Sequence, residues 1–187
     1  MRKGHVGGAF LILLGFDSFL RTGELLSLII ADVVIDEGET GIVKLAHTKT
    51  GQRTAAYEAT TISDPLCAQL FRVFLSELPP STRSQNYIFL PKAHVFHTLF
   101  KEGLTWLGLE KYGFQPYSLR RGGATAYFRA TRNMEATLDR GRWASARVAR
   151  IYVNDGLAKE VELRFNTEIQ DRLRLYAGAL GLWLRSR

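Results

Sequence analysis

The stretch that decides the fold runs from residue 116 to residue 153 and reads PYSLRRGGATAYFRATRNMEATLDRGRWASARVARIYV. Near its start an arginine doublet, Arg120 and Arg121, precedes Gly122 and Gly123, which we expect to loosen the first turn of a helix. A guanidinium is always charged and presents a planar fork of donors that matches a phosphate. Backbone N–H groups at a helix start favour the same ligand. The doublet therefore predicts a phosphate-binding site.

Two aromatic residues follow the doublet at informative intervals. Trp143 lies in the tripeptide GRW, and Tyr152 follows it by nine residues. The run Y-S-L-R-R, then G-R-W, then this tyrosine resembles the second half of the catalytic domain of tyrosine recombinases of the phage integrase type. That family is marked by H-x-x-R, then His or Trp, then a nucleophilic Tyr. In this chain Tyr117 stands where the family usually has His.

The first half of the chain carries two more stretches that resemble the same family. FLRTGELLSL, which contains Arg21 and Glu24, resembles its R-x-x-E-L-x-x-L box. HTKTGQR, which contains Lys49, resembles the hairpin that carries its lysine. Four boxes in the family's order are more specific than any one of them. The resemblance covers roughly residues 8 to 156 and implies a crypton-like or mobile-element-derived catalytic domain.

The resemblance and the hydrophobic pattern together predict an α+β fold that is mainly helical. One small antiparallel three-stranded sheet is expected near residues 32 to 61, where Val, Ile and Thr alternate with Gly-containing turns. We expect residues 1–187 to form a single tyrosine recombinase catalytic domain, without the N-terminal DNA-clamp domain that the family usually carries. After residue 157 the pattern predicts one long or broken helix.

The two boxes of the first half are expected at junctions between elements. Arg21 should lie between a buried core helix and a second helix, whose first turn Thr22 can cap. Lys49 should lie in the turn between the second and third strands, where a hairpin tip can carry it over a bound ligand.

The resemblance implies breakage and rejoining of a DNA phosphodiester without metal or cofactor. The hydroxyl of Tyr152 attacks phosphorus, a 3′-phosphotyrosyl bond forms, and a 5′-hydroxyl leaves; rejoining reverses the step. A phenol is a weak nucleophile until nearby cations favour its ionised form. Arg21 and Arg120 are expected to stabilise the charge that gathers on the phosphate oxygens. Lys49 would protonate the departing oxygen, and Glu24 would orient the basic groups.

The remaining candidate residues are Trp143, Tyr117 and Arg121. Trp143 offers an indole N–H and a ring that excludes water, although plain core packing is the alternative. Tyr117 is counted among the catalytic residues, but a phenol is chiefly a donor near neutral pH, so we expect slower chemistry than with His. Arg121 is interpreted as a structural or DNA-backbone-contacting neighbour. The DNA-binding set is therefore Arg21, Lys49, Arg120 and Arg121.

Composition is compatible with this interpretation. Hydrophobic residues make up 46% of the chain and charged residues 23%, which is ordinary for a globular domain, and the net charge of +7 favours a polyanionic partner. The expected partner is double-stranded DNA, bound by a homo-oligomer, with no membrane association. Cys67 is the only cysteine, so an internal disulfide is impossible. The expected location is intracellular: the nucleus in a eukaryote, the cytoplasm or nucleoid in a bacterium.

Three alternatives stay open from the sequence. The first is a DNA-binding module that keeps the fold but is catalytically impaired, which Tyr117 favours. The second is an enzyme like the type IB topoisomerases, which share the chemistry but relax supercoils. The third is a helical structural protein with no nucleic-acid role.

Overall fold

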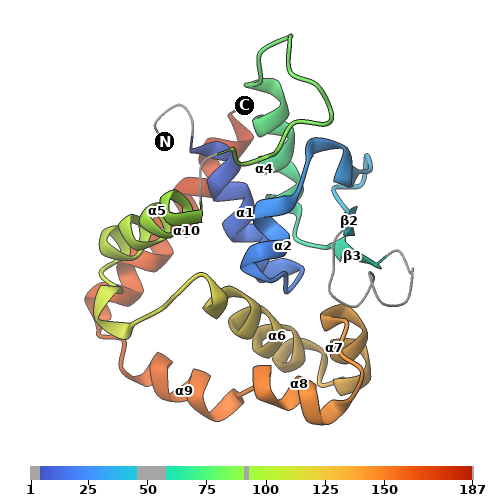
Figure 1. Cartoon of the computed structure of the whole chain (residues 1–187). Helices are drawn as coiled ribbons and strands as arrows, with labels where there is room; N and C mark the ends of the chain where they lie inside the picture. Colours follow the sequence, from blue (N-terminus) through green and yellow to red (C-terminus); the bar gives the residue numbers. More distant parts are fainter. Residues whose placement is uncertain (1–4, 46–57, 91–92, 187) are drawn as a thin grey trace.

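The fold is mainly helical, with one small sheet at the side of the helices (Figure 1). The computed structural model describes residues 5–45, 58–90 and 93–186. The predicted α+β, mainly helical fold class is confirmed. No helix within these ranges is long and apolar enough to cross a membrane.

Helix α1 (Val6–Asp17) lies at the centre of the molecule. It packs against α4 (Pro65–Ser76) on one side and α6 (Tyr117–Thr131) on another. Phe10 and Leu14 of α1 are fully buried, as expected for a helix that is apolar on almost every side. The predicted core helix is therefore confirmed.

The sheet is small and antiparallel throughout. Its strands, in spatial order, are β1 (Val33–Ile35), β2 (Gly41–Leu45) and β3 (Glu58–Ile62). Val43 in the middle strand pairs with Val33 on one side and Thr60 on the other. Its side chain and that of Leu45 are buried, and the alternating residues Ile42 and Lys44 are exposed, as a strand with one buried face requires. The predicted sheet is confirmed, whereas Lys49 lies outside the described residues.

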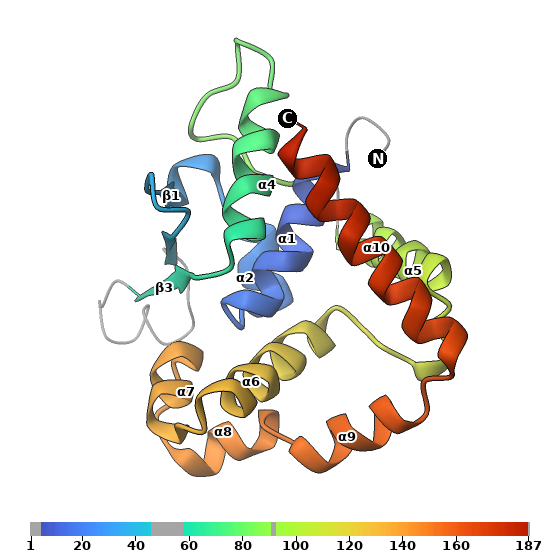
Figure 2. The same ribbon diagram turned by 180° about the vertical axis from the view of Figure 1, so that it is seen from behind.

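Helices make up most of the rest of the chain. In chain order they are α2 (Thr22–Ser27), the short η1 (Ile30–Asp32), α5 (Ala93–Leu107), the short η2 (Glu110–Tyr112), α7 (Met134–Gly141), α8 (Ala146–Tyr152), α9 (Asp155–Leu163) and α10 (Thr167–Arg185). The long or broken helix expected after residue 157 is thus broken. Asn166 begins α10, because its side chain accepts a hydrogen bond from the backbone N–H of Ile169 at 3.0 Å. Helix α10 then runs back across the molecule and packs against α4 and α5 (Figure 2).

The two glycines after the arginine doublet have a different role from the one predicted. Gly122 and Gly123 lie inside α6 rather than loosening its start, so that prediction is wrong. Gly123 lies where α6 crosses α1, and a Cβ at this position would overlap the carbonyl oxygen of Phe16. The missing side chain lets the two helices approach closely. This approach brings the first turn of α6, which contains Arg120, against the end of α1.

Arg140 holds the α7 region against the end of α1 and against the sheet. Its side chain is 9% exposed and pairs with the Asp17 carboxylate, with Nη2 and Oδ1 2.7 Å apart. Nε donates to the Asp17 carbonyl at 2.9 Å, and Nη1 donates to the hydroxyls of Thr61 and Ser63 at 2.9 Å. A buried guanidinium with this many partners fixes three elements relative to one another. It thereby fixes α7 and the turn that leads to Trp143.

Candidate active site

Arg21 stands at the junction between α1 and α2, as predicted. It is itself the N-cap residue of α2, so the prediction that Thr22 caps this helix is wrong. The reason is Glu24: its Oε2 accepts a hydrogen bond from the backbone N–H of Arg21 at 2.8 Å, and its Oε1 pairs with Arg21 Nη1 at 2.6 Å. Glu24 is buried, whereas the Arg21 side chain is 45% exposed. The carboxylate therefore anchors a guanidinium that still faces solvent.

Arg120, in the first turn of α6, is completely buried. Its Nη1 donates to the Phe19 carbonyl, and its Nη2 donates to the Gly141 carbonyl at 2.9 Å. Its Nε is also buried and has no hydrogen-bond partner within the described part of the chain. Burial, together with the charges of Arg21 and Arg142, lowers the pKa of Arg120 to about 10. The structure thus holds a charged group that an anion would stabilise.

The rings of Trp143 and Tyr152 stack beside this guanidinium. Their centroids are 4.8 Å apart and their planes 18° from parallel. Arg120 Cζ lies 4.9 Å from the Trp143 ring centroid and 5.1 Å from that of Tyr152. Phe19 stacks against Trp143 as well, with ring centroids 6.2 Å apart. Trp143 is buried, and among the described residues its indole Nε1 has no hydrogen-bond partner.

Tyr117, the first residue of α6, also lies next to Tyr152. The two ring centroids are 6.0 Å apart. Partial burial, then the interaction with the neighbouring Tyr152 hydroxyl, raise the pKa of Tyr117 and outweigh the opposing charges of Arg120 and Arg121. Tyr117 is therefore a neutral phenol near neutral pH, able to donate a hydrogen bond. Arg121 itself is half-buried.

The predicted residues thus gather from three parts of the chain. Arg21 and Glu24 come from the α1–α2 junction, Tyr117 and Arg120 from α6, and Trp143 and Tyr152 from the start and end of the α8 region. Arg21 is near enough to Arg120 to lower its pKa. Lys49 cannot be placed with them, because it lies outside the described residues.

Comparison with known proteins identifies the fold. No family model matches the chain, and neither does any curated protein sequence. A crystal structure of XerH site-specific recombinase bound to palindromic difH substrate, a post-cleavage complex, superposes with a TM-score of 0.64 and 20% identity, over 81% of this chain and 43% of that one. A pre-cleavage XerH complex with difH gives a TM-score of 0.64 and 19% identity, over 86% of this chain and 46% of that one. The fold is that of a tyrosine recombinase catalytic domain. The chain spans less than half the length of either structure.

One residue of this recombinase-fold site was missed from the sequence. Arg142 follows α7, and its side chain is 10% exposed. Its Nη2 lies 2.8 Å from Glu24 Oε2, and its Nε lies 3.4 Å from Glu58 Oε2. Burial alone would raise the pKa of Glu24, but the charge of Arg142 and the hydrogen bonds and charge of Arg21 hold it below its usual value. Its place in the tripeptide GRW, directly before Trp143, was the one available signal.

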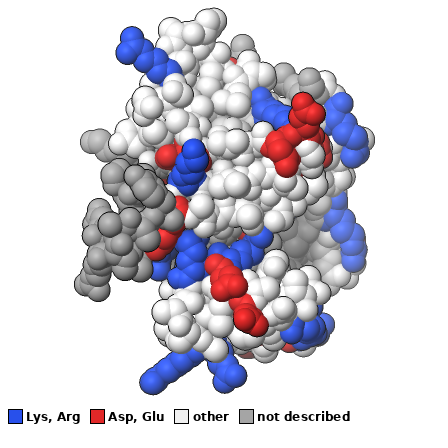
Figure 3. Space-filling model, turned by 90° about the vertical axis from the view of Figure 1, so that its right-hand side faces the viewer, with Lys and Arg blue, Asp and Glu red and all other residues white. Residues whose placement is uncertain are grey.

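On one face of the molecule, positive and negative charges are mixed. On the face in Figure 3, basic and acidic side chains lie next to one another instead of forming separate areas. Long-range attraction of DNA by such a face is weaker than the net charge alone suggests, because neighbouring opposite charges partly cancel.

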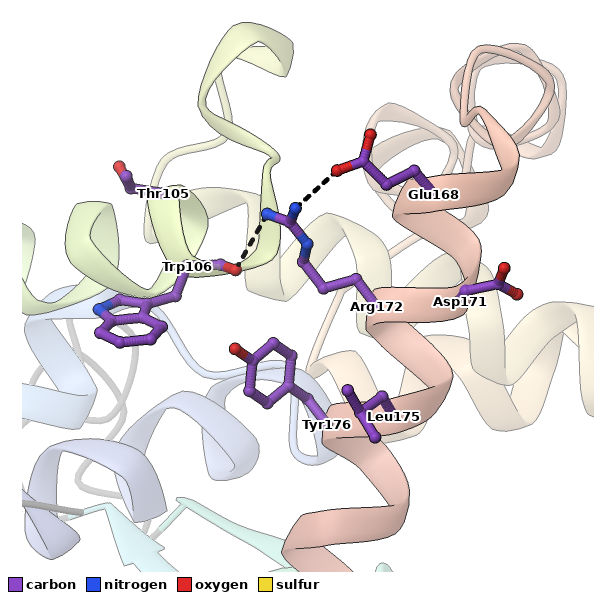
Figure 4. A pocket seen from close by; sticks show the side chains of 7 residues that line it. All are labelled: Thr105, Trp106, Glu168, Asp171, Arg172, Leu175 and Tyr176. Carbon is purple, nitrogen blue, oxygen red and sulfur yellow. Dashed lines mark hydrogen bonds and ion pairs between the residues drawn. The ribbon is translucent and has the colours of Figure 1, made fainter.

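An open hollow of about 750 Å³ lies away from this site, between α5 and α10 (Figure 4). Its lining residues are Thr105, Trp106, Glu168, Asp171, Arg172, Leu175 and Tyr176. Arg172 crosses the hollow, with Nη2 2.7 Å from Glu168 Oε1 and Nη1 3.4 Å from the Trp106 carbonyl. The hollow thus has its own ion pair and is separate from the gathered arginines.

Proposed function

We propose that this chain breaks and rejoins DNA strands through a covalent bond between Tyr152 and a 3′ phosphate. The observation that carries the proposal is the placement of the Tyr152 ring 5.1 Å from the guanidinium of Arg120, with Arg21 nearby. A nucleophile for phosphorus needs fixed cations beside it, because negative charge gathers on the phosphate in the transition state. The recombinase fold agrees with this chemistry.

In the proposed step, the Tyr152 oxygen forms a bond to phosphorus while the bond from phosphorus to the 5′ oxygen breaks. The phenol proton leaves Tyr152, and the departing 5′ oxygen gains a proton, which Lys49 would supply. Attack by a 5′-hydroxyl on the phosphotyrosine reverses each of these changes. No cofactor is consumed, because the energy of the phosphodiester is kept in the phosphotyrosyl bond.

Three groups are suited to hold the phosphate. Arg21 has an exposed guanidinium that Glu24 anchors. Arg120 Nε and Trp143 Nε1 are buried N–H donors without a partner in the described part of the chain. A buried donor left unpaired is costly, so in this proposal DNA binding opens the site and a phosphate oxygen accepts from these donors.

Tyr117 and Arg121 have supporting roles in this proposal. Tyr117 remains protonated near neutral pH and can donate a hydrogen bond to the Tyr152 oxygen. Arg121 would contact the DNA backbone. The substrate is double-stranded DNA, and the biological reaction is site-specific recombination or integration, carried out by a homo-oligomer of a mobile-element-derived protein.

A DNA-binding module without strand exchange is the second candidate. Tyr117 favours it, because a phenol is a poor proton acceptor where the family pattern has an imidazole. A topoisomerase-like activity shares the covalent intermediate and differs only in relaxing supercoiled DNA.

The direct test uses 5′-labelled duplex DNA of randomised sequence, nicked so that a short 5′-hydroxyl fragment diffuses away after cleavage. The wild-type chain should give a protein–DNA adduct on a denaturing gel, and Tyr152→Phe should give none while binding the same DNA. Binding should weaken steeply with salt, because phosphate contacts release counterions. Preserved binding with no adduct from the wild type would favour the binding module.

A further inference from the structure

Arg142 occupies an unusual backbone position for a long charged residue. It ends α7 in the left-handed conformation, with φ of 55°. Glycine is the residue most often found in this conformation after a helix, because a Cβ makes it less favourable. The Arg142 side chain is nevertheless about nine-tenths buried, with 10% of its surface exposed. Contacts made by that side chain must offset the strain of the left-handed backbone and the burial of a positive charge.

The main contact is with Glu24, which lies 118 residues away in the sequence. Arg142 Nη2 donates to Glu24 Oε2 at 2.8 Å, and Arg142 Nε lies 3.4 Å from Glu58 Oε2. The same Glu24 carboxylate holds Arg21 through its backbone N–H and its Nη1. Glu24 therefore links an arginine of the α1–α2 junction to an arginine of the α7–α8 turn.

The charge balance of this link matters for Arg21. One buried carboxylate is shared by two guanidinium groups, so neither cation is fully neutralised by it. If Arg142 were removed, the whole carboxylate charge would be opposed by Arg21 alone. The attraction of Arg21 for a phosphate would then fall, because opposite charges within a few ångströms cancel each other's field.

We propose that Arg142 is a positioning residue for strand cleavage. Acting through Glu24, it keeps the guanidinium of Arg21 in place and leaves part of its positive charge available for the phosphate. This inference rests on the function proposed above. Arg142 also connects α2 and β3 to the turn before Trp143, so it holds together the parts of the site that come from separate segments.

The test compares Arg142→Ala, Glu24→Gln and the double variant in single-turnover cleavage of DNA that is already bound. Arg142→Ala should slow cleavage by at least about tenfold. The double variant should cleave as fast as Glu24→Gln alone, because a neutral glutamine no longer cancels Arg21. If Arg142 served only packing, the fold losses in cleavage rate from Arg142→Ala and Glu24→Gln would multiply in the double variant. That result would overturn the proposal.

Arg142→Lys tests whether the cleavage rate depends on the positive charge of residue 142 or on the shape of its side chain. It also replaces Arg142→Ala in the test if that variant fails to fold. A lysine beside Glu24 should recover most of the lost rate, and a rate no better than that of Arg142→Gln contradicts the proposal. Arg174→Ala is the control, since it removes an arginine that is 70% exposed on α10. Arg174→Ala should cleave DNA at the wild-type rate.

A second measurement does not depend on activity. Carbon-13 NMR of labelled glutamate reads the pKa of Glu24, which Arg142→Ala should raise, because burial would then be less opposed. An unchanged pKa overturns the inference whether or not the wild type cleaves DNA. A wild type that forms no adduct, with the pKa of Glu24 raised in the variant, would instead count against the proposed function.

Discussion

The indole ring of Trp143 stacks on the phenol ring of Tyr152, with centroids 4.8 Å apart and planes 18° from parallel. The guanidinium of Arg120 lies within about 5 Å of both rings, so a cation and an aromatic stack restrain one phenol together. A side chain held in this way has little conformational freedom left to lose when a ligand binds. In the proposed reaction, the stack would therefore hold Tyr152 ready to attack phosphorus.

Replacement of Trp143 should separate its packing from its N–H group. Trp143→Ala removes a buried ring and should lower the free energy of unfolding by about 3 to 5 kcal/mol. Trp143→Phe keeps a ring against Tyr152 but loses the indole N–H, and it should slow cleavage by about 100-fold with a smaller loss of stability. Urea unfolding and single-turnover cleavage measure the two effects. Cleavage by Trp143→Phe at the wild-type rate would show that the N–H does not serve the reaction.

Gly123 should be intolerant of any side chain. Gly123→Ala places a Cβ against the Phe16 carbonyl, and we expect it to lower the free energy of unfolding by about 4 kcal/mol or more. Gly178→Ala, in the middle of α10, is the control, because no described atom lies within 4 Å of its added Cβ. It should stabilise the protein by up to about 1 kcal/mol, since alanine favours a helix over glycine. Equal effects of the two substitutions in urea unfolding would contradict the close approach of α1 and α6.

The sequence predicted the parts of the site that depend on local order. Arg21, Arg120, Trp143 and Tyr152 each lie in a short box, and the structure places these boxes at element ends. Arg142 escaped notice because its role depends on Glu24, which lies 118 residues away. A salt bridge over that distance leaves no periodic pattern in the chain.

The two wrong local predictions have the same physical origin. Thr22 has the side chain of a helix cap, but Glu24 bonds to the N–H of the preceding residue, so α2 has Arg21 as its N-cap. Gly123 suggested a loose helix start, but what decides its role is the carbonyl of Phe16 on a different helix. Contacts between elements overrode the local preference in both cases.

Acid should remove the stabilising contribution of Glu24. Burial opposes its ionisation, but Arg142 and Arg21 prevail, and its folded-state pKa lies below the ordinary value of 4.5. The contribution is therefore complete above pH 4.5 and is lost as the pH falls through the folded-state pKa. Glu24→Gln should lower the free energy of unfolding by about 3 kcal/mol at about pH 7, and the difference from wild type should shrink at about pH 3.

Urea unfolding at both pH values measures the Glu24 contribution. Glu168→Gln is the control, because its carboxylate is 73% exposed and pairs with Arg172 at the surface. Glu168→Gln should change the free energy of unfolding by close to zero at both pH values. A Glu24→Gln difference that is the same at both pH values would contradict the charge balance assigned to this carboxylate.

Tyr117 should limit the rate near neutral pH. Partial burial and the interaction with the neighbouring Tyr152 hydroxyl raise the pKa of Tyr117, so the phenol stays protonated and cannot accept a proton. Tyr117→His should increase the rate of adduct formation by about tenfold or more, because an imidazole can act as a base there. Tyr117→Phe should slow adduct formation, because phenylalanine cannot donate a hydrogen bond to Tyr152. A histidine variant slower than wild type would show that this position has no acid–base role.

The identity of the residue that carries DNA tests the central claim most directly, because Tyr117 and Tyr152 are neighbours in the site. After nuclease and trypsin digestion of the adduct, mass spectrometry should find the nucleotide on residues 151–159, IYVNDGLAK, whose single tyrosine is Tyr152. A nucleotide on residues 112–120, YGFQPYSLR, or on any other peptide, would contradict the assignment of Tyr152 as the nucleophile.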